Sequence, residues 1–208
     1  MTTHSESHVD EDTQAQMAYV MEALGQFAER VMVFIDAGYL QACVRDQFQG
    51  RAVDLEKFVR RLVGKRRLVR AYYYTSKIEK PPDEYWKDQQ RDQQKYLAAL
   101  AYQPFIEVRL GRLQFGEGNR ARQKGVDVLL AIDMLRFALK KNYDTAILVS
   151  GDGDFADIVK MVKDEGLKVE TLTFPKTRAW ALTEAADLNL ELTGEILDGC
   201  WLDRTPKK

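Results

Sequence analysis

Three aspartates stand at the ends of two short apolar segments of the sequence. Asp36 ends the segment VMVFID, and Asp152 and Asp154 lie in SGDGDF, which closes the segment TAILVS. Such runs, rich in β-branched and apolar residues without polar alternation, are typical of parallel strands that are buried on both faces. Ligands of open α/β sheets bind at the carboxyl ends of the strands. We therefore expect these carboxylates to lie at one edge of a sheet.

A further segment, KGVDVLLAIDML, adds Asp127 near the start of a helix that is apolar on most sides. An ionised carboxylate in that setting is unfavourable unless it is paired or bound to a metal ion. Several carboxylates without histidine or cysteine form a hard-oxygen site, which suits Mg²⁺ or Mn²⁺ and not zinc. Such a cluster could also hold two ions about 3.5–4 Å apart and drive in-line displacement at a phosphodiester bond.

Asp133 lies on the same predicted helix, further along than Asp127. At about 100° per residue, the two side chains point about 120° apart around the helix axis. Asp133 is therefore a candidate for supporting the ligands from behind or for capping a helix, and not a certain ligand.

Each of these aspartates also has an ordinary structural explanation. An aspartate at a strand end commonly caps the next helix, and D-G-D in a loop commonly forms a turn. An aspartate early in a helix is favoured by the helix dipole. Only the combination of these positions at one sheet edge favours a functional site.

Basic residues gather in the segment that leads to Asp127. Residues 111–124, GRLQFGEGNRARQK, are expected to form one long irregular loop, a kind of segment that is commonly functional. A basic rim beside an acidic metal site would neutralise the phosphates of a nucleic acid, and Phe115 or Tyr39 could stack on unpaired bases. A solvated loop with surface arginines is the alternative. The residues expected to bind substrate are Arg112, Arg120, Arg122 and Lys124, preceded by Arg109 and accompanied by a single acid, Glu117.

The elements that must position these residues alternate along the chain. Apolar β-rich runs predict strands, and apolar residues at three- and four-residue spacing predict helices. Strands that alternate with helices indicate an α/β fold with a central parallel sheet flanked by helices, in one domain at 31–193. The expected strands are 31–36, 68–74, 105–110, 145–150 and 167–174, and the expected helices are 54–64, 83–102, 124–141 and one built on Phe155, Ile158, Val159 and Val162.

Three further segments flank this domain. Residues 1–14 are expected to be a disordered acidic tail, because they hold too few apolar groups to pack. A helix is expected at 15–30, where apolar residues recur at helical spacing. Residues 194–208 are expected to form a C-terminal extension.

The composition restricts the classes of partner. The 208 residues include 31 basic and 32 acidic side chains, with a formal net charge of −1. Overall charge therefore predicts neither nucleic-acid nor membrane binding, and any affinity for RNA must come from a local patch. Cys43 and Cys200 lie far apart and indicate neither a disulfide scaffold nor a zinc site. Without a long apolar run or a signal-peptide pattern, the chain is expected to be soluble and cytoplasmic.

Four segments together resemble a known family. They are VMVFIDAGYL (31–40), KGVDVLLAIDMLRFA (124–138), TAILVSGDGDFADIVKMVKDEGLKVE (145–170) and RAWALTEAADLNLEL (178–192). On these segments the chain resembles the NYN-domain family, and within it the LabA-like branch of the PIN-like nuclease superfamily. The resemblance covers residues 30–193, and its specific part is the combination of K-G-V-D with S-G-D-G-D-F.

The resemblance implies a three-layer PIN-like fold and a ribonuclease activity that depends on Mg²⁺ or Mn²⁺ and is usually endonucleolytic. Many members have an asparagine three residues after the first aspartate, where this chain has Tyr39, and no role is transferred to that tyrosine. The catalytic and metal-binding aspartates of the family correspond to Asp36, Asp127, Asp152 and Asp154, and its lysine near the site corresponds to Lys124.

We therefore expect a divalent-metal-dependent ribonuclease that hydrolyses phosphodiester bonds in single-stranded or structured RNA. Ions held by the aspartates would supply hydroxide near neutral pH for in-line attack on phosphorus. Lys124 would offset the developing negative charge.

Other functions remain as alternatives at this point. A non-catalytic regulator on the same fold would bind RNA or a protein partner, and Tyr39 and the acidic tail are compatible with it. A phosphatase or phosphoacceptor domain would form a covalent aspartyl phosphate, but D-A-G at 36–38 is not the D-x-D of haloacid-dehalogenase-like enzymes. A homo-oligomer formed through helix 124–139 or the N-terminal helix is also left open.

Overall fold

The computed structural model describes residues 28–116, 121–177 and 179–202, together with Thr13, Gln16 and Val20. Most of the expected tail 1–14 and of the expected helix 15–30 therefore lies outside the described residues, as does the end of the expected extension 194–208. Arg120 is also outside them.

A mixed sheet forms the centre of the described structure, with the strand order β4-β3-β2-β1-β5-β6-β7. Neighbouring strands are parallel except for β3 and β4, which are antiparallel. The strands are β1 (Arg30–Asp36), β2 (Arg67–Lys77), β3 (Ile106–Phe115), β4 (Ala121–Lys124), β5 (Thr145–Val149), β6 (Lys168–Thr173) and β7 (Leu188–Glu191).

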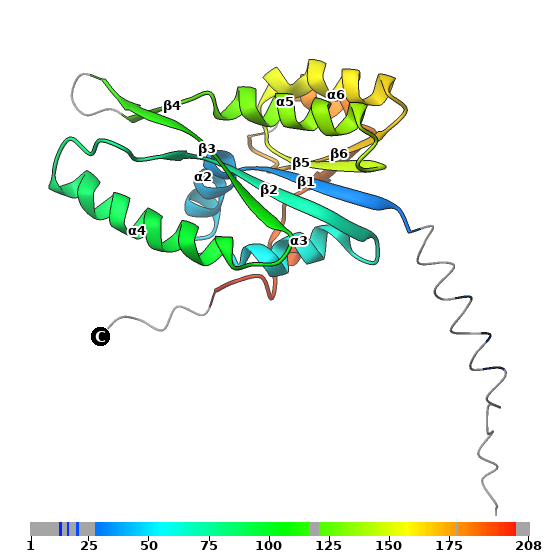
Figure 1. Ribbon diagram of the computed structural model, residues 1–208, viewed down its shortest axis with the longest axis horizontal. Coiled ribbons are helices and arrows are strands. Elements are labelled where there is room, and N and C mark those ends of the chain that lie inside the picture. Colours follow the sequence, from blue (N-terminus) through cyan, green and yellow to red (C-terminus); the bar gives the residue numbers. More distant parts are fainter. Residues whose placement is uncertain are drawn as a thin grey trace, which may run out of the picture.

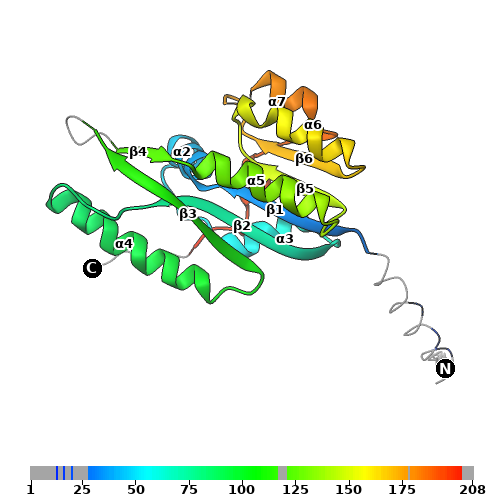
Figure 2. The same cartoon turned by 45° about the horizontal axis from the view of Figure 1, so that its top comes forward.

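Helices cover both faces of this sheet and make three layers (Figures 1 and 2). Helices α3, α4 and α8 lie on one face with most of α2, and helices α5, α6 and α7 lie on the other. Among the described helices, none is long and apolar enough to cross a membrane. The helices are α2 (Ala37–Gln47), α3 (Leu55–Val63), α4 (Glu84–Ala101), α5 (Val126–Leu139), α6 (Ala156–Asp164), α7 (Trp180–Ala185) and α8 (Gly194–Leu197), with a 3-10 turn η2 (Gly153–Phe155).

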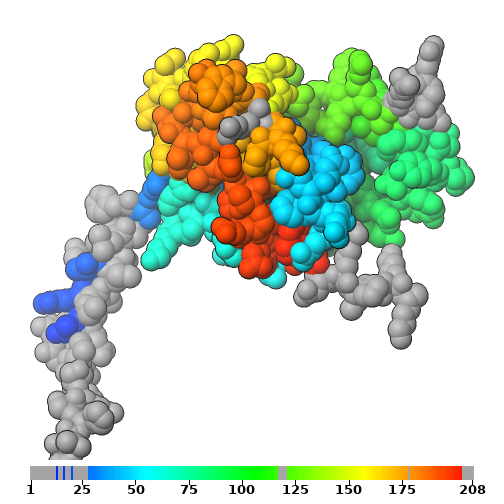
Figure 3. Space-filling view, turned by 180° about the vertical axis from the view of Figure 1, so that it is seen from behind, coloured from blue at the N-terminus to red at the C-terminus, as the bar shows by residue number. Residues whose placement is uncertain are grey.

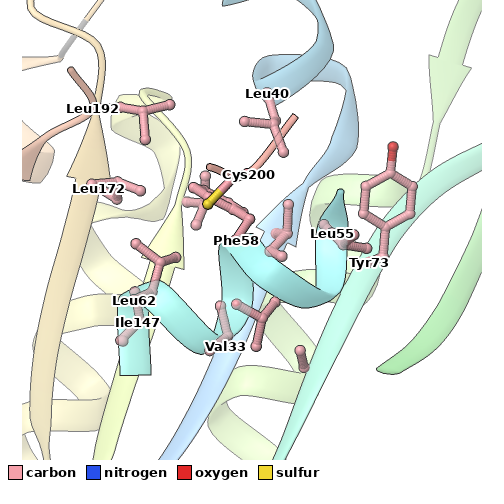
Figure 4. Close-up of a cluster of buried hydrophobic side chains, with 14 of the residues drawn as sticks. Val33, Leu40, Leu55, Phe58, Leu62, Tyr73, Ile147, Leu172, Leu192 and Cys200 are labelled. Carbon is pink, nitrogen blue, oxygen red and sulfur yellow. The ribbon is translucent and has the colours of Figure 1, made fainter. Parts of the chain in front are cut away.

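Strand β1 shows how the sheet separates two hydrophobic cores. Val31, Val33 and Ile35 face the core under α3, while Met32 and Phe34 face the core under α5. Side chains alternate between the faces of a strand, so a strand in the middle of a three-layer fold must be apolar on both sides. Figure 4 shows the first of these cores, to which Val33 of β1 and Phe58 of α3 both belong.

The described part of the expected C-terminal extension packs onto the same core. Leu197 and Cys200 are buried there. The backbone amide of Asp54 donates to the carbonyl oxygen of Cys200 at 2.7 Å. The backbone amide of Leu202 donates to the carbonyl oxygen of Ala52 at 2.9 Å. These contacts fasten residues 194–202 to the start of α3.

The predicted alternation of strands and helices is confirmed, with one correction. The five predicted strands correspond to β1, β2, β3, β5 and β6, but residues 111–124 are not one irregular loop. Strand β3 continues to Phe115 and forms an antiparallel hairpin with β4. Its outer half is an edge strand in which half-buried Leu113 and Phe115 alternate with exposed Arg112 and Gln114. That alternation is a β signal, and the hairpin makes the sheet mixed.

At the amino ends of two central strands, an ion pair joins the start of β1 to the start of β5. The guanidinium of Arg30 donates from Nη2 to Oδ1 of Asp144 at 2.7 Å, and the backbone amide of Arg30 donates to Oδ2 at 2.8 Å. The hydrogen bond from the Arg30 side chain is the main reason that the pKa of Asp144 is lowered. This contact lies at the amino end of both strands, away from the aspartates at their carboxyl ends.

Replacing Asp144 with asparagine should lower the free energy of unfolding at neutral pH by about 0.5–1 kcal/mol, as for a partly exposed ion pair. The pKa of Asp144 is lower in the folded protein than its ordinary value of 3.8. The stabilisation is therefore present above the unfolded pKa and is lost as the pH falls through the folded pKa. Urea unfolding at a series of pH values measures this, with Asp157→Asn as a control at an exposed pair. A difference from wild type that stays constant into strong acid would contradict the prediction.

Candidate functional site

Asp36 ends β1 and begins α2, and its carboxylate is held from two directions. Oδ1 accepts the backbone amide of Tyr39 at 3.1 Å, which makes Asp36 the N-cap of α2. The hydroxyl of Ser150 donates to Oδ2 at 3.4 Å. Burial raises the pKa of Asp36, and the negative charge of Asp127 raises it further. Asp36 is therefore both a helix cap and a fixed, partly desolvated carboxylate.

Ser150 joins Asp36 to the aspartates that follow β5. Strands β1 and β5 are neighbours, with Ile35 opposite Val149, so the next residues, Asp36 and Ser150, meet at the strand ends. The Ser150 hydroxyl, which is fully buried, also accepts the backbone amide of Asp152 at 3.2 Å. This residue is not among the predicted site residues, although its place between TAILV and GDGD is a signal that could have identified it.

Asp152 and Asp154 lie on the turn that follows β5, and both side chains are exposed. Oδ1 of Asp152 accepts the backbone amide of Asp154 at 3.0 Å and so caps the 3-10 turn η2. The expected turn is therefore present, and it directs both side chains to the carboxyl edge of the sheet.

Asp127 approaches the same edge from the first turn of α5. Partial desolvation of its carboxylate raises the pKa of Asp127, and the charges of Asp152 and Asp154 raise it further. Three separate segments thus bring four predicted aspartates close enough for their charges to act on one another.

Asp133 does not belong to this cluster. Its buried carboxylate accepts the hydroxyl of Tyr74 and Nε of Arg109, each at 3.2 Å, and pairs with Nη2 of Arg136 at 2.8 Å. Two guanidinium groups and a phenol therefore occupy it. Its role is to fasten α5 to β2 and β3, and Arg109 is held there instead of facing a substrate.

The predicted substrate-binding cations of the hairpin lie on one of its two faces. Arg112 is opposite Lys124 in the antiparallel register, and Gln114 is opposite Arg122. Residues directly opposite each other share a face, so these cations are on the same side. All three are exposed, and none has an ion pair within the described part of the chain. Only Gly125 separates Lys124 from α5, so this cationic face ends three residues before Asp127 in the sequence.

The comparison with known families agrees with this geometry. The family model for the NYN domain matches residues 30–192, from β1 to the end of β7. The chain belongs to the NYN domain family. This is a PIN-like nuclease family, and the matched residues include all four clustered aspartates.

Two known proteins are similar to this NYN domain. It is 29% identical over 126 residues to the low amplitude and bright protein LabA of Synechococcus elongatus, covering 60% of this chain and 63% of LabA. A crystal structure of a Vibrio parahaemolyticus protein of unknown function superposes with a TM-score of 0.61 at 22% identity, covering 84% of this chain and 97% of that one. The second likeness concerns the fold alone.

Tyr39 forms a clamp between the start of α2 and the loop after β6. Its hydroxyl accepts the backbone amide of Phe174 at 2.7 Å and lies 3.0 Å from the hydroxyl of Thr177. A Cβ on Gly151 would lie 2.4 Å from the Thr177 carbonyl oxygen and 2.5 Å from Cε2 of Tyr39. Only glycine therefore fits between the tyrosine and the loop after β6, next in sequence to Asp152.

The four clustered aspartates have the ligand atoms that a hard divalent ion prefers. The four aspartates offer only oxygen ligands, as Mg²⁺ and Mn²⁺ prefer. In the described part of the chain, no group of three or more acidic, histidine or cysteine side chains is placed to hold a metal ion. Asp127, Asp152 and Asp154 are exposed, and exposed side chains change rotamer on the picosecond-to-nanosecond timescale. For the four aspartates to bind one ion together, the three exposed side chains must therefore change rotamer, while hydrogen bonds hold the carboxylate of Asp36 in place.

Replacing Tyr39 with phenylalanine should lower the free energy of unfolding by about 1–2 kcal/mol, because the partly buried amide of Phe174 loses its acceptor. Urea unfolding measures the effect. The matched control is Tyr85→Phe, at a side chain that is 64% exposed. If both variants unfold at the wild-type midpoint, the clamp adds nothing to stability.

Proposed function

We propose that this NYN domain is a divalent-metal-dependent endoribonuclease, with its active site at the four aspartates on the carboxyl edge of the sheet. The observation that carries the proposal is the convergence of these carboxylates at one edge of the sheet. Burial raises the pKa of Asp36 and the pKa of Asp127; the charge of Asp127 raises the first further, and the charges of Asp152 and Asp154 raise the second further. Gathering like charges opposes folding, so an arrangement of this kind is expected where a cation is bound.

The four aspartates do not all have the same role in the proposed site. Asp36 is the fixed ligand, because the Ser150 hydroxyl and the Tyr39 amide hold its carboxylate. Asp127 and Asp152 turn toward it as further ligands, and Asp154 either joins them or orients the attacking water. When bound, Mg²⁺ or Mn²⁺ lowers the pKa of a coordinated water and offsets charge on the phosphate.

The basic face of the hairpin supports RNA as the substrate. Arg112, Arg122 and Lys124 are exposed on one face and can neutralise backbone phosphates on both sides of the cleaved bond. Lys124 is closest in sequence to Asp127 and is assigned to the phosphate that is cleaved. In this proposal the aspartates serve catalysis and the cations bind the substrate.

A non-catalytic RNA-binding regulator is the second candidate, and Tyr39 favours it. The tyrosine takes the position of an asparagine that many relatives have, and its hydroxyl is engaged by Phe174 and Thr177. Whatever polar contact an asparagine makes in those relatives must come from another group here. Turnover separates the two candidates, because a binder protects RNA and a nuclease shortens it.

Replacing Asp152 with asparagine should reduce metal-dependent cleavage of RNA by at least about 100-fold, since loss even of groups that only orient metal ligands commonly has effects of 10–100-fold. The assay uses a mixed-sequence single-stranded RNA and its DNA counterpart at low salt, with Mg²⁺, with Mn²⁺ and with neither. Asp157→Asn is the matched control, because this exposed aspartate lies on α6 and pairs with Lys160.

Internal fragments that need both the metal and Asp152 support the endoribonuclease. Intact RNA with a salt-sensitive mobility shift supports the regulator. Cleavage that survives in Asp152→Asn at the level of the control contradicts the assignment of the site.

A further inference from the structure

A cavity of about 870 Å³ lies beside the aspartate site, between α2, α4 and the β3–β4 hairpin. Its floor is the carboxyl-terminal half of β2, with Tyr73 and Thr75. Small-molecule sites commonly have volumes of about 300–1,000 Å³. Figure 3 shows the face on which α2, in light blue, stands next to the green of α4. None of the aspartates proposed to bind metal lines this cavity.

The lining of the cavity suits an uncharged, hydrogen-bonding, aromatic ligand. Its cations are already engaged, because Arg45 pairs with Asp46 at 2.9 Å and Arg51 lies 4.1 Å from the ring centroid of Trp201. The lining therefore differs from a phosphate site. The lining also holds the exposed carboxylate of Asp92, which lies 3.8 Å from Nζ of Lys95. Its uncharged polar and aromatic groups include Gln41, which donates to the Tyr73 hydroxyl, together with Gln89, Gln123, Thr75, Trp86 and Tyr96.

These groups match the chemistry of a nucleobase. A glutamine amide both donates and accepts, as the edge of a base does. Aromatic side chains stack on unpaired bases with little regard to sequence. Of the glutamines in the lining, Gln41 and Gln93 donate to Tyr73 and Ser76. Within the described residues, the side chains of Gln89 and Gln123 have no such bond, so their amides remain available. Trp86 stands at the hairpin end of the cavity, with its ring 4.9 Å from that of Phe115.

The cavity is connected to the aspartate site through Gln123 and Gly38. A Cβ on Gly38 would lie 3.1 Å from Nε2 of Gln123 and 3.3 Å from Oδ1 of Asp36. The cavity amide and the site carboxylate therefore face each other across a glycine. In addition, Asp36 is paired in register with Tyr74, the residue between Tyr73 and Thr75 of the cavity floor.

The hairpin separates this cavity from the cationic face. Leu113 is opposite Gln123 in the register, and both line the cavity. Arg112, Arg122 and Lys124 occupy the alternate positions and so the opposite face. A single strand that crosses the hairpin beside Asp36 can place its phosphates on the cationic face and a base in the cavity.

We propose that the cavity between α2, α4 and the hairpin is a nucleoside subsite, which binds one unstacked base and its ribose from an RNA strand that lies at the aspartates. As a site on an RNA strand, it rests on the proposed function. Gln123 reads the edge of the base, and Trp86 packs on it. The subsite gives the enzyme a base preference at a fixed distance from the cleaved bond.

The first test measures binding without catalysis. Adenosine, guanosine, cytidine and uridine are titrated at millimolar concentrations, without divalent metal, into the full chain, and tryptophan fluorescence is recorded. At least one nucleoside should change the fluorescence of wild type, and the change should vanish in Trp86→Phe. The Kd of that nucleoside should rise about tenfold in Gln123→Ala, because the variant lacks one amide that contacts the edge of the base. The control is Gln114→Ala, an exposed glutamine on the opposite face of the same hairpin, which should bind as wild type does.

The second test maps cleavage sites in a mixed-sequence RNA with the same variants. Wild type and Gln114→Ala should share a base preference at one position, and Gln123→Ala should lose it. If RNA is cut without preference and no nucleoside binds, the subsite is wrong while the proposed function stands. If nucleosides bind through Gln123 but RNA is not cut, the proposed function is wrong while the subsite stands. Equal losses in Gln123→Ala and Gln114→Ala overturn the subsite.

Discussion

Repulsion among four carboxylates is the constraint on which the rest of the structure depends. Asp36, Asp127, Asp152 and Asp154 come from three segments. Burial raises the pKa of Asp36 and of Asp127, and the charges of neighbouring aspartates raise both further. The stability that offsets this comes from elsewhere, from the two apolar cores on either side of β1. The Ser150 hydroxyl provides the local link, because it contacts both the carboxylate of Asp36 and the amide of Asp152. The site is therefore rigid at Asp36 and adjustable at its exposed members.

The β3–β4 hairpin gives this edge of the sheet two different surfaces. One face carries Arg112, Arg122 and Lys124, and the other carries Leu113 and Gln123. Strict alternation along two paired strands is enough to separate charged from neutral groups. The same hairpin also leads directly into α5 and so sets the position of Asp127. In the proposed enzyme, substrate binding and the placement of Asp127 thus depend on one small, exposed element.

The sequence predicts best what local pattern decides. The runs ending at Asp36 and Ser150 are apolar on both sides, and they are central strands as predicted. Helical geometry alone also separates Asp133 from the ligand set. Its partners, Tyr74 and Arg109, could not be predicted, because β2 and β3 bring them to α5 from distant parts of the chain. The hydroxyl contact of Tyr39 with Phe174 spans 135 residues and is equally non-local. The sequence predicts a loop where the hairpin forms, because an exposed edge strand is too polar to resemble the buried strands. The catalytic roles of the aspartates stay a prediction.

The most direct measurement of the central claim is the thermal unfolding of wild type and Asp127→Asn with and without Mn²⁺. An ion that binds only the folded protein stabilises it by about 2.7 kcal/mol at 100 times its Kd. Mn²⁺ should therefore raise the Tm of wild type, and most of that rise should be lost in Asp127→Asn. Without metal the variant should be at least as stable as wild type, because folding raises the pKa of Asp127 and so disfavours its charged form. A Tm that Mn²⁺ leaves unchanged in wild type, or raises equally in both proteins, would contradict the account.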